Sequence, residues 1–218
     1  IEEVRKRKIS GINITVPFKK IVISYLDQLT HEADTTQSVN TIYLDKNKIV
    51  GHNTDIEGFE MSIKKSKYNI ADKEVLILGS GGVVPSIIYA LNKMKVTKIT
   101  LSNRTKDKAE NLKKLFENLK VVNWGEIPKF DIIINATSIG LNKNDIINLD
   151  LSNSGKNKFF YDLIYNPKET NFLKTGKELG NYVENGKMMF IHQASAAFKI
   201  WHGIEPLIND DVIELLDK

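Results

Sequence analysis

The sequence predicts an α/β protein with a doubly wound parallel sheet and a second, smaller α/β unit, and two observations carry this prediction. From Lys73 onward, short continuous apolar runs alternate with segments of helical periodicity, for example VLIL at Val75–Leu78 and DIIIN at Asp131–Asn135. Strands without polar alternation are typical of a parallel sheet that helices cover on both faces. Before Lys73 the strand-like runs are shorter and end in polar clusters, which indicates a separate lobe.

In the first lobe, the β-branched run Ile12–Val16 predicts a strand that Pro17 ends. Ile21–Leu29 has helical spacing. Two short strands around a turn and a following helix are then expected at Asn40–Leu44, Lys48–Gly51 and Asp55–Lys65. Ile1–Lys8 resembles the end of a charged helix, and since the chain does not begin with Met, we expect an N-terminal segment to be missing from this lobe.

The second lobe is expected to alternate strands and helices. Its strands are predicted at Val75–Leu78, Lys98–Ser102, Asp131–Asn135 and Phe159–Ile164. A helix follows the first strand up to Lys93, and its Pro85 is tolerated because a first-turn N–H has no helical partner to lose. Further helices are predicted at Lys106–Asn118, Thr170–Leu179, Met188–Trp201 and Asp210–Leu216.

Composition excludes several classes of protein. The 218 residues are 41% hydrophobic and 27% charged, as in ordinary globular domains. A net charge of +4 is too small to indicate nucleic acid, and no apolar run approaches the roughly 18 residues of a membrane span. Without cysteine there is no disulfide or thiolate site, which favours a reducing compartment, the cytoplasm. The four histidines lack metal-ligand spacing, so we predict no metal: His31, His52, His192 and His202.

A glycine cluster indicates a nucleotide phosphate site. Gly79-Ser80-Gly81-Gly82 follows a predicted strand and opens a helix, so its backbone can approach a pyrophosphate at the helix N-terminus. The G-x-G-x-x-G fingerprint is incomplete, because Val84 stands at its last position. A glycine loop without a ligand is the alternative, and the flanking strand and helix argue against it.

The end of the second strand favours NADP over NAD. An NAD site usually carries Asp or Glu there, whereas this chain has Asn103-Arg104-Thr105, followed by Lys106 and Lys108. A guanidinium can pair with a 2′-phosphate and stack on adenine. The alternative is a solvated basic helix start, but cations oppose the dipole at a helix N-terminus, which makes an anionic partner more plausible.

Three polar clusters end strands of the first lobe, within Asn13–Lys19, at Asn40-Thr41 and at Asn53–Asp55. Any one of them alone is explained by capping or a turn. Together they supply many short neutral donors and acceptors, which suits a polyhydroxylated ligand.

Motifs in this order give the chain a family resemblance: NITVPFK, SVNT, GHNTD, GSGG, NRT, INATSIG, YDLIYNP and NGKMMFIHQASAAF. The chain resembles shikimate dehydrogenases of aromatic amino-acid biosynthesis over essentially its whole length. The resemblance implies reversible, NADPH-dependent reduction of 3-dehydroshikimate to shikimate. A monomer and a homodimer are equally consistent with the sequence, and its charge and hydropathy indicate neither nucleic acid nor a membrane as partner. The alternation of strands and helices places a Rossmann-type NADP domain at residues 67–186, a substrate domain at 1–66, and C-terminal helices at 187–218 that return to the substrate domain.

The resemblance assigns roles to individual residues. It implies that Lys19 and Asp55 are catalytic. Besides Asp55, it implies four substrate-binding residues: Thr15, Asn40, Tyr165 and Gln193. The implied cofactor residues are Gly79, Gly81, Gly82, Asn103, Arg104, Thr105, Lys108, Asn135, Thr137, Ser138, Leu163, Gly186 and Met189.

Four departures from the family pattern are expected to matter. Val83–Pro85 replaces the usual small and basic residues after the glycines, and Gln37-Ser38 replaces the commoner Gly-Ala. Met188 stands where glycine is usual and could crowd the nicotinamide. No Ser-x-Ser that would bind the substrate carboxylate precedes Asn13.

Two other functions stay open at this point. An NAD-dependent quinate/shikimate dehydrogenase would need an acidic residue near position 103, where this chain has Asn103. A non-catalytic nucleotide-binding relative or fragment is opposed by the presence of both Lys19 and Asp55.

Overall fold

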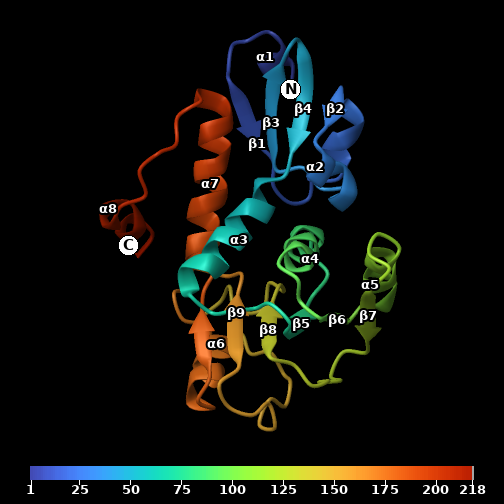
Figure 1. The fold of residues 1–218 in the computed structure, drawn as a ribbon, viewed down its shortest axis with the longest axis vertical. Coiled ribbons are helices and arrows are strands. Elements are labelled where there is room, and N and C mark those ends of the chain that lie inside the picture. The colour runs from blue at the N-terminus through green and yellow to red at the C-terminus, as the bar shows by residue number, and fades with distance from the viewer. Residues whose placement is uncertain (218) are drawn as a thin grey trace.

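The computed structural model contains two sheets at opposite ends of the molecule (Figure 1), and it describes residues 1–217. A four-stranded sheet has the order β1-β3-β4-β2, and a six-stranded sheet has the order β10-β9-β8-β5-β6-β7. The larger sheet is parallel throughout, with helices on both faces. The predicted class, a doubly wound Rossmann-type sheet beside a smaller α/β unit, is therefore confirmed.

In the smaller sheet, β1 (Gly11–Asn13) and β4 (Lys48–His52) flank β3 (Thr41–Asp45), both antiparallel to it. The helix predicted at Ile21–Leu29 is wrong. A 3₁₀-helix, η1 (Ile21–Tyr25), occupies only the first part of this segment, and β2 (Gln28–Leu29) pairs in parallel with β4. The other elements of this lobe are α1 (Glu2–Arg5), η1 (Ile21–Tyr25), β2 (Gln28–Leu29) and α2 (His31–Thr36).

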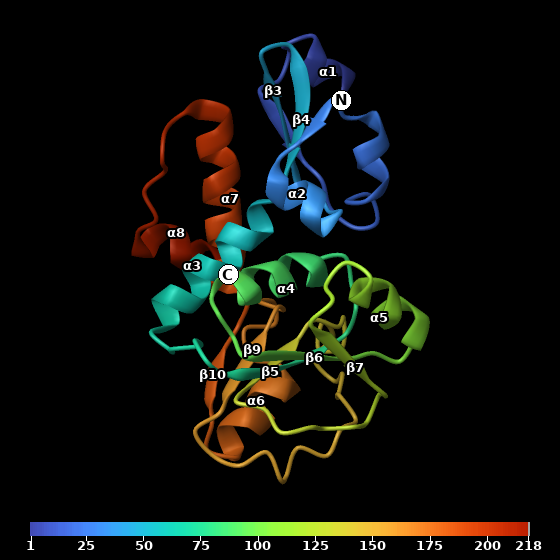
Figure 2. The same cartoon turned by 45° about the vertical axis from the view of Figure 1, so that its right-hand side comes forward.

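In the larger sheet, alternate side chains face opposite layers, as a strand requires. Val75 and Ile77 join the apolar cluster beneath α3 (Thr54–Ser66) and α4 (Val84–Lys93), whereas Leu76 and Leu78 pack with Phe172 of α6 (Asn171–Glu178). Figure 2 shows α4 and α5 on one face of the sheet and α6 on the other.

The bounds of the larger sheet and its helices are close to those predicted, except at the edges. The edge strands β7 and β10 were not predicted, and α5 ends at Lys113 rather than Asn118. The strands are β5 (Glu74–Leu78), β6 (Lys98–Ser102), β7 (Leu119–Val122), β8 (Ile132–Asn135), β9 (Phe159–Asp162) and β10 (Tyr182–Glu184). The helices are α4 (Val84–Lys93), α5 (Lys106–Lys113), α6 (Asn171–Glu178), α8 (Asp210–Glu214) and η2 (Leu215–Asp217).

Two long helices, α3 (Thr54–Ser66) and α7 (Lys187–His202), lie side by side between the sheets (Figure 1). Helix α3 begins beside the smaller sheet, and its Phe59 packs edge-on against Tyr161 of the larger sheet, with ring centroids 5.3 Å apart. The close approach of α7 depends on Gly58, where an added Cβ would lie 2.7 Å from the Met189 carbonyl oxygen. The start of α3 is thus fixed at the boundary between the lobes.

Asn53 joins the start of α3 to both lobes. Its Oδ1 accepts a hydrogen bond from the Asp55 backbone N–H (3.2 Å), which caps α3. Its Nδ2 donates to the Ser38 carbonyl oxygen (2.9 Å) and to Ser86 Oγ on α4 (2.8 Å). All of these groups are buried, so loss of the Asn53 side chain would leave polar groups without partners.

We predict that Asn53→Ala lowers the free energy of unfolding by about 2–4 kcal/mol. The loss combines a helix cap, worth about 1 kcal/mol, with buried groups left unsatisfied, about 1–3 kcal/mol. Asn209, which caps the exposed α8 by accepting from Val212 N–H, is the control, and Asn209→Ala should cost about 1 kcal/mol or less. Urea unfolding measures both, and equal losses would contradict this account of Asn53.

Candidate active site

A cleft of about 420 Å³ opens where the two lobes meet. Both predicted catalytic residues line it, and so do the predicted substrate-binding residues Thr15, Asn40, Tyr165 and Gln193. Leu163, Gly186 and Met189, predicted to border the nicotinamide, lie in the same wall. The fold thus brings together residues from the start, middle and end of the chain.

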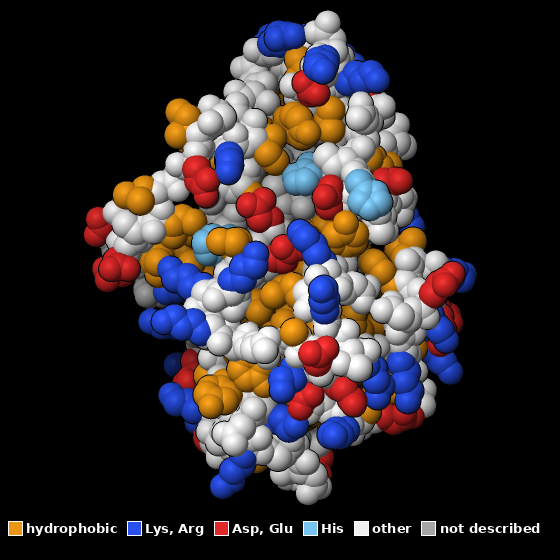
Figure 3. Space-filling view, in the orientation of Figure 1, with side chains coloured by type: hydrophobic (Ala, Val, Ile, Leu, Met, Phe, Trp, Pro, Cys, Tyr) orange, Lys and Arg blue, Asp and Glu red, His pale blue; other side chains and the backbone are white. Residues whose placement is uncertain are grey.

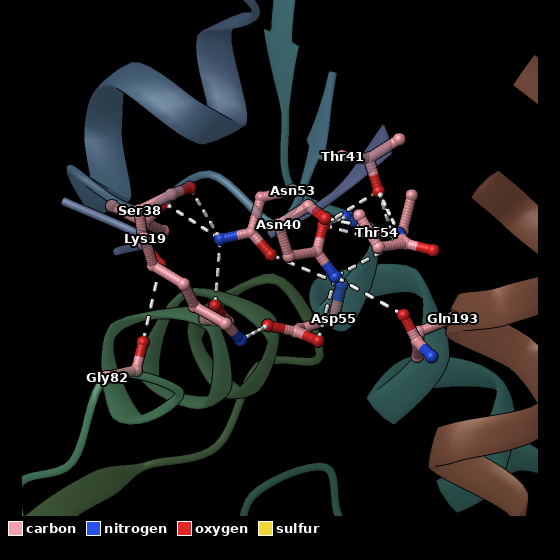
Figure 4. Close-up of polar contacts among 12 residues, drawn as sticks. Lys19, Ser38, Asn40, Thr41, Asn53, Thr54, Asp55, Gly82 and Gln193 are labelled. Atoms are coloured by element: carbon pink, nitrogen blue, oxygen red, sulfur yellow. Dashed lines mark hydrogen bonds and ion pairs between the residues drawn. The ribbon is translucent and has the colours of Figure 1, made fainter. Parts of the chain in front are cut away.

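At the centre of this cleft, Lys19 forms a buried ion pair with Asp55. Lys19 Nζ donates to Asp55 Oδ2 at 2.5 Å, and the two side chains are only 12% and 9% exposed (Figure 4). Asp55 occupies the first turn of α3, where the helix dipole favours a carboxylate. Because little water surrounds the pair, its attraction is weakly screened.

Asn40 holds the other side of the Asp55 carboxylate. Its Nδ2 donates to Asp55 Oδ1 (2.9 Å), and Gln193 Oε1 from α7 lies 3.4 Å from the same nitrogen (Figure 4). Asn40 Oδ1 accepts a hydrogen bond from the Thr54 backbone N–H (2.8 Å). Both carboxylate oxygens therefore have partners, and the surrounding amide groups suit a ligand rich in hydroxyl groups.

Aromatic and apolar side chains complete the wall. The rings of Tyr165 and Phe190 stack with centroids 4.8 Å apart. Phe190 was not predicted, although its helical spacing of three residues from Gln193 placed it on the same face of α7. Val83 lines the cleft, whereas the buried Met188 is not among the residues that do, so the expected crowding by Met188 is not seen.

A larger hollow of about 740 Å³ lies next to this cleft and shares Asn13–Thr15 with it. Its wall includes the exposed side chains of Phe18 and Tyr25. Neither Lys19 nor Asp55 lines it. We therefore take the smaller cleft, which contains the ion pair, as the candidate for chemistry.

A separate cleft of about 300 Å³ lies at the carboxyl ends of β5 and β6. Most of the predicted cofactor residues line it: Gly79, Gly81, Asn103, Arg104, Thr105, Lys108, Thr137 and Ser138. Gly79 has a φ of +99°, and a Cβ there would lie 2.8 Å from the Ala136 carbonyl oxygen, so only glycine fits. Helix α4 begins just after this loop, and its Val84 N–H donates to the Gly81 carbonyl oxygen (3.0 Å).

Two predicted cofactor residues, Gly82 and Asn135, line neither of these two clefts. Gly82 faces a neighbouring hollow, where its carbonyl oxygen accepts from Ser38 Oγ (3.3 Å), so one departure from the family pattern ties the lobes together. Asn135 is fully buried, and its Oδ1 accepts from the Thr137 backbone N–H (3.1 Å). Asn135 thus shapes the loop of the cleft without lining it.

The second cleft has the donors that an NADP phosphate needs. Arg104 and Lys108 are exposed at its edge, and neither forms an ion pair with another residue of the described chain. With the backbone of the glycine loop at the start of α4, they offer two cations and the positive end of a helix dipole to an anion. On the face of the molecule drawn in Figure 3, Lys and Arg side chains are interspersed with Asp and Glu.

Residues 1–217 contain neither a candidate membrane span nor a candidate metal site. No helix in this range is long and apolar enough to cross a membrane. No group of three or more His, Asp or Glu side chains in it is placed to hold a metal ion.

Comparisons with known proteins agree with this geometry. The family model described as the shikimate dehydrogenase substrate binding domain matches residues 1–42, and that of shikimate / quinate 5-dehydrogenase matches residues 61–171. The shikimate dehydrogenase (NADP(+)) of Pelagibacter ubique is 57% identical over 217 residues, which cover 100% of this chain and 82% of that protein. This chain belongs to the shikimate dehydrogenase family.

Solved structures of the family superpose well on this member. The shikimate dehydrogenase from Aquifex aeolicus has a TM-score of 0.88 at 39% identity and covers 100% of this chain and 80% of its own. The Thermus thermophilus shikimate 5-dehydrogenase, in complex with NADP(H) and shikimate, has a TM-score of 0.87 at 29% identity, covering 98% and 80%. The predicted family and class of enzyme, an NADP-dependent oxidoreductase, are confirmed.

Beneath both clefts of this shikimate dehydrogenase family member, the buried Asp162 links the loops that line them. Its Oδ1 accepts from Asn135 Nδ2 and from the Ile164 backbone N–H, both at 3.0 Å, and its Oδ2 accepts from Thr170 Oγ1 at 2.6 Å. Burial raises the pKa of Asp162 from 3.8 to about 6, although the hydrogen bond from Thr170 opposes the shift.

We predict that the Asp162 carboxyl contributes to stability in its protonated form. Because its pKa is higher in the folded chain, the contribution is complete below about pH 4 and is lost as pH rises through 6. Relative to Asp162→Asn, the wild type should lose about 2 kcal/mol of unfolding free energy between pH 4 and pH 7. Urea unfolding across this range measures the difference, and a pH-independent difference would contradict the prediction.

Proposed function

We propose that this chain catalyses the reversible reduction of 3-dehydroshikimate to shikimate, with NADPH as the reductant. The buried Lys19–Asp55 pair carries this proposal, because it faces a cleft of hydroxyl-binding side chains next to a phosphate-binding loop. Relatives named shikimate dehydrogenase (NADP(+)) support it.

Lys19 is the proposed proton donor. NADPH, when bound, supplies a hydride to the ketone carbon, and negative charge then develops on the ketone oxygen. The Lys19 ammonium gives that oxygen a proton, and Asp55 favours the charged lysine and orients it. In the direction of oxidation Lys19 accepts the hydroxyl proton and passes it to solvent, so oxidation should be faster at higher pH.

The remaining residues bind and orient the ligands. We assign the substrate hydroxyls to Thr15, Asn40, Asp55 and Gln193, and a contact with the substrate to Tyr165. The pyrophosphate is assigned to Gly79 and Gly81 with the start of α4, and the 2′-phosphate to Arg104 and Lys108. Leu163, Gly186 and Met189 form the border of the nicotinamide.

The proposal keeps the domain boundaries expected from sequence: a substrate domain at 1–66, an NADP domain at 67–186 and returning helices at 187–218. Both a monomer and a homodimer are compatible with it. We place the reaction in the cytoplasm, because a chain without cysteine suits a reducing compartment.

An initial-rate assay of oxidation with NADP or NAD, and with shikimate or quinate, tests this function. We predict turnover with shikimate and NADP, at a kcat/KM at least tenfold above that with NAD, because Asn103-Arg104 stands where an NAD site has an acidic residue. Preference for NAD and quinate would instead identify the rival dehydrogenase. Cofactor binding without turnover on either substrate would identify a non-catalytic relative.

Lys19→Ala should lower kcat by two to four orders of magnitude, the usual range for one acid–base group, with a smaller effect on the KM for shikimate. Lys20→Ala is the matched control, since Lys20 is the exposed neighbour and does not line the cleft of the ion pair. Near-normal kcat in Lys19→Ala, measured in the same assay, would remove Lys19 from the mechanism.

A further inference from the structure

Trp124 lines the second cleft together with Arg104 and the glycine loop. It is one of only two tryptophans in the sequence, and it follows the end of β7. The residue is half-buried, and its apolar surface packs against the core cluster that contains Leu76 and Leu78. Its indole is therefore supported from below while it forms part of the cleft wall.

The backbone around Trp124 is tied to the strand end that carries Arg104. Ser102 is the last residue of β6, and its Oγ donates a hydrogen bond to the Asn123 carbonyl oxygen (3.1 Å). Asn123 Nδ2 in turn donates to Glu126 Oε1 across the turn that contains Trp124. The indole and the guanidinium thus project from two adjacent strand ends whose separation is fixed by a hydrogen bond.

The strand order fixes which half of a dinucleotide meets Trp124. The chain runs outward from β5 to β6 and β7 on one side and from β8 to β9 and β10 on the other, so the topological switch lies between β5 and β8. A dinucleotide binds across this point at the carboxyl ends of the strands. Leu163, which follows β9, lines the cleft of the ion pair, so the nicotinamide half lies on the β8–β9 side and the adenosine half over β6 and β7.

We propose that Trp124 is the platform on which the adenine of NADP stacks, with Arg104 on the opposite face of the base. The inference rests on the proposed function, because it takes NADP as the cofactor. Adenine offers a flat π surface to the indole, and a guanidinium over its other face adds a cation–π contact. Trp124 therefore increases affinity for the adenosine part of the cofactor and takes no part in proton or hydride transfer.

Tryptophan fluorescence tests this contact directly. The probe is adenosine 2′,5′-bisphosphate, which has the adenine and the 2′-phosphate but no nicotinamide that could accept energy from a distant tryptophan. In Trp201→Phe, only Trp124 emits, and we expect saturable quenching with the dissociation constant found by calorimetry. In Trp124→Phe only Trp201 emits, from α7, where its Nε1–H donates to the Ile42 carbonyl oxygen, and we expect no quenching.

Affinity gives a second, independent readout. Trp124→Ala should weaken binding of the bisphosphate and raise the KM for NADP by about tenfold, with kcat unchanged. Trp124→Phe keeps an aromatic face and should stay within about threefold of wild type, which also controls for folding.

Unchanged Trp124 emission and unchanged affinity in Trp124→Ala, while the bisphosphate still binds, would overturn the platform and leave the proposed function intact. If the wild type binds neither the bisphosphate nor NADP, both the Trp124 platform and the proposed function are overturned.

Discussion

The buried ion pair between Lys19 and Asp55 is the interaction on which the rest of the site depends. Removing two charges from water is costly, and such a pair persists only where its partners are held in good geometry and the remaining lone pairs are satisfied. The structure meets this condition with the dipole of α3 behind Asp55 and the amide of Asn40 on its second oxygen. Lys19, Asn40 and Asp55 belong to three separate polar clusters in the sequence, and in the structure they form one hydrogen-bonded network.

Helix α3 transmits the position of this pair to the cofactor domain. Its first turn carries Asp55, its cap Asn53 binds Ser86 on α4, and its apolar side packs on the larger sheet through Phe59. Helix α4 begins at the glycine loop, so this loop and Asp55, the ion-pair partner of Lys19, are connected through one hydrogen bond and two helices. A reaction that joins hydride and proton transfer at adjacent atoms requires such a fixed relation between the two lobes.

The sequence predicted what depends on local pattern and missed what depends on distant partners. The buried strands and the glycine loop were found because continuous apolar runs and a turn before a helix are local signals. The strand β2 was mistaken for a helix because its pairing with Val50 and Gly51 is a non-local contact. Edge strands such as β10 cover little apolar surface, and Trp124 belongs to no motif, so only the fold shows that it lines the same cleft as Arg104.

Chemical rescue of Lys19→Ala tests the central claim, that the Lys19 amine transfers the proton, most directly. Shikimate oxidation by this variant would be measured with added methylamine, and with tetramethylammonium, which can neither give nor take a proton, as the matched control. The account predicts that methylamine restores turnover at least tenfold, in proportion to the neutral amine present, and that tetramethylammonium restores none. Equal stimulation by both cations, or rapid turnover with neither, would contradict it.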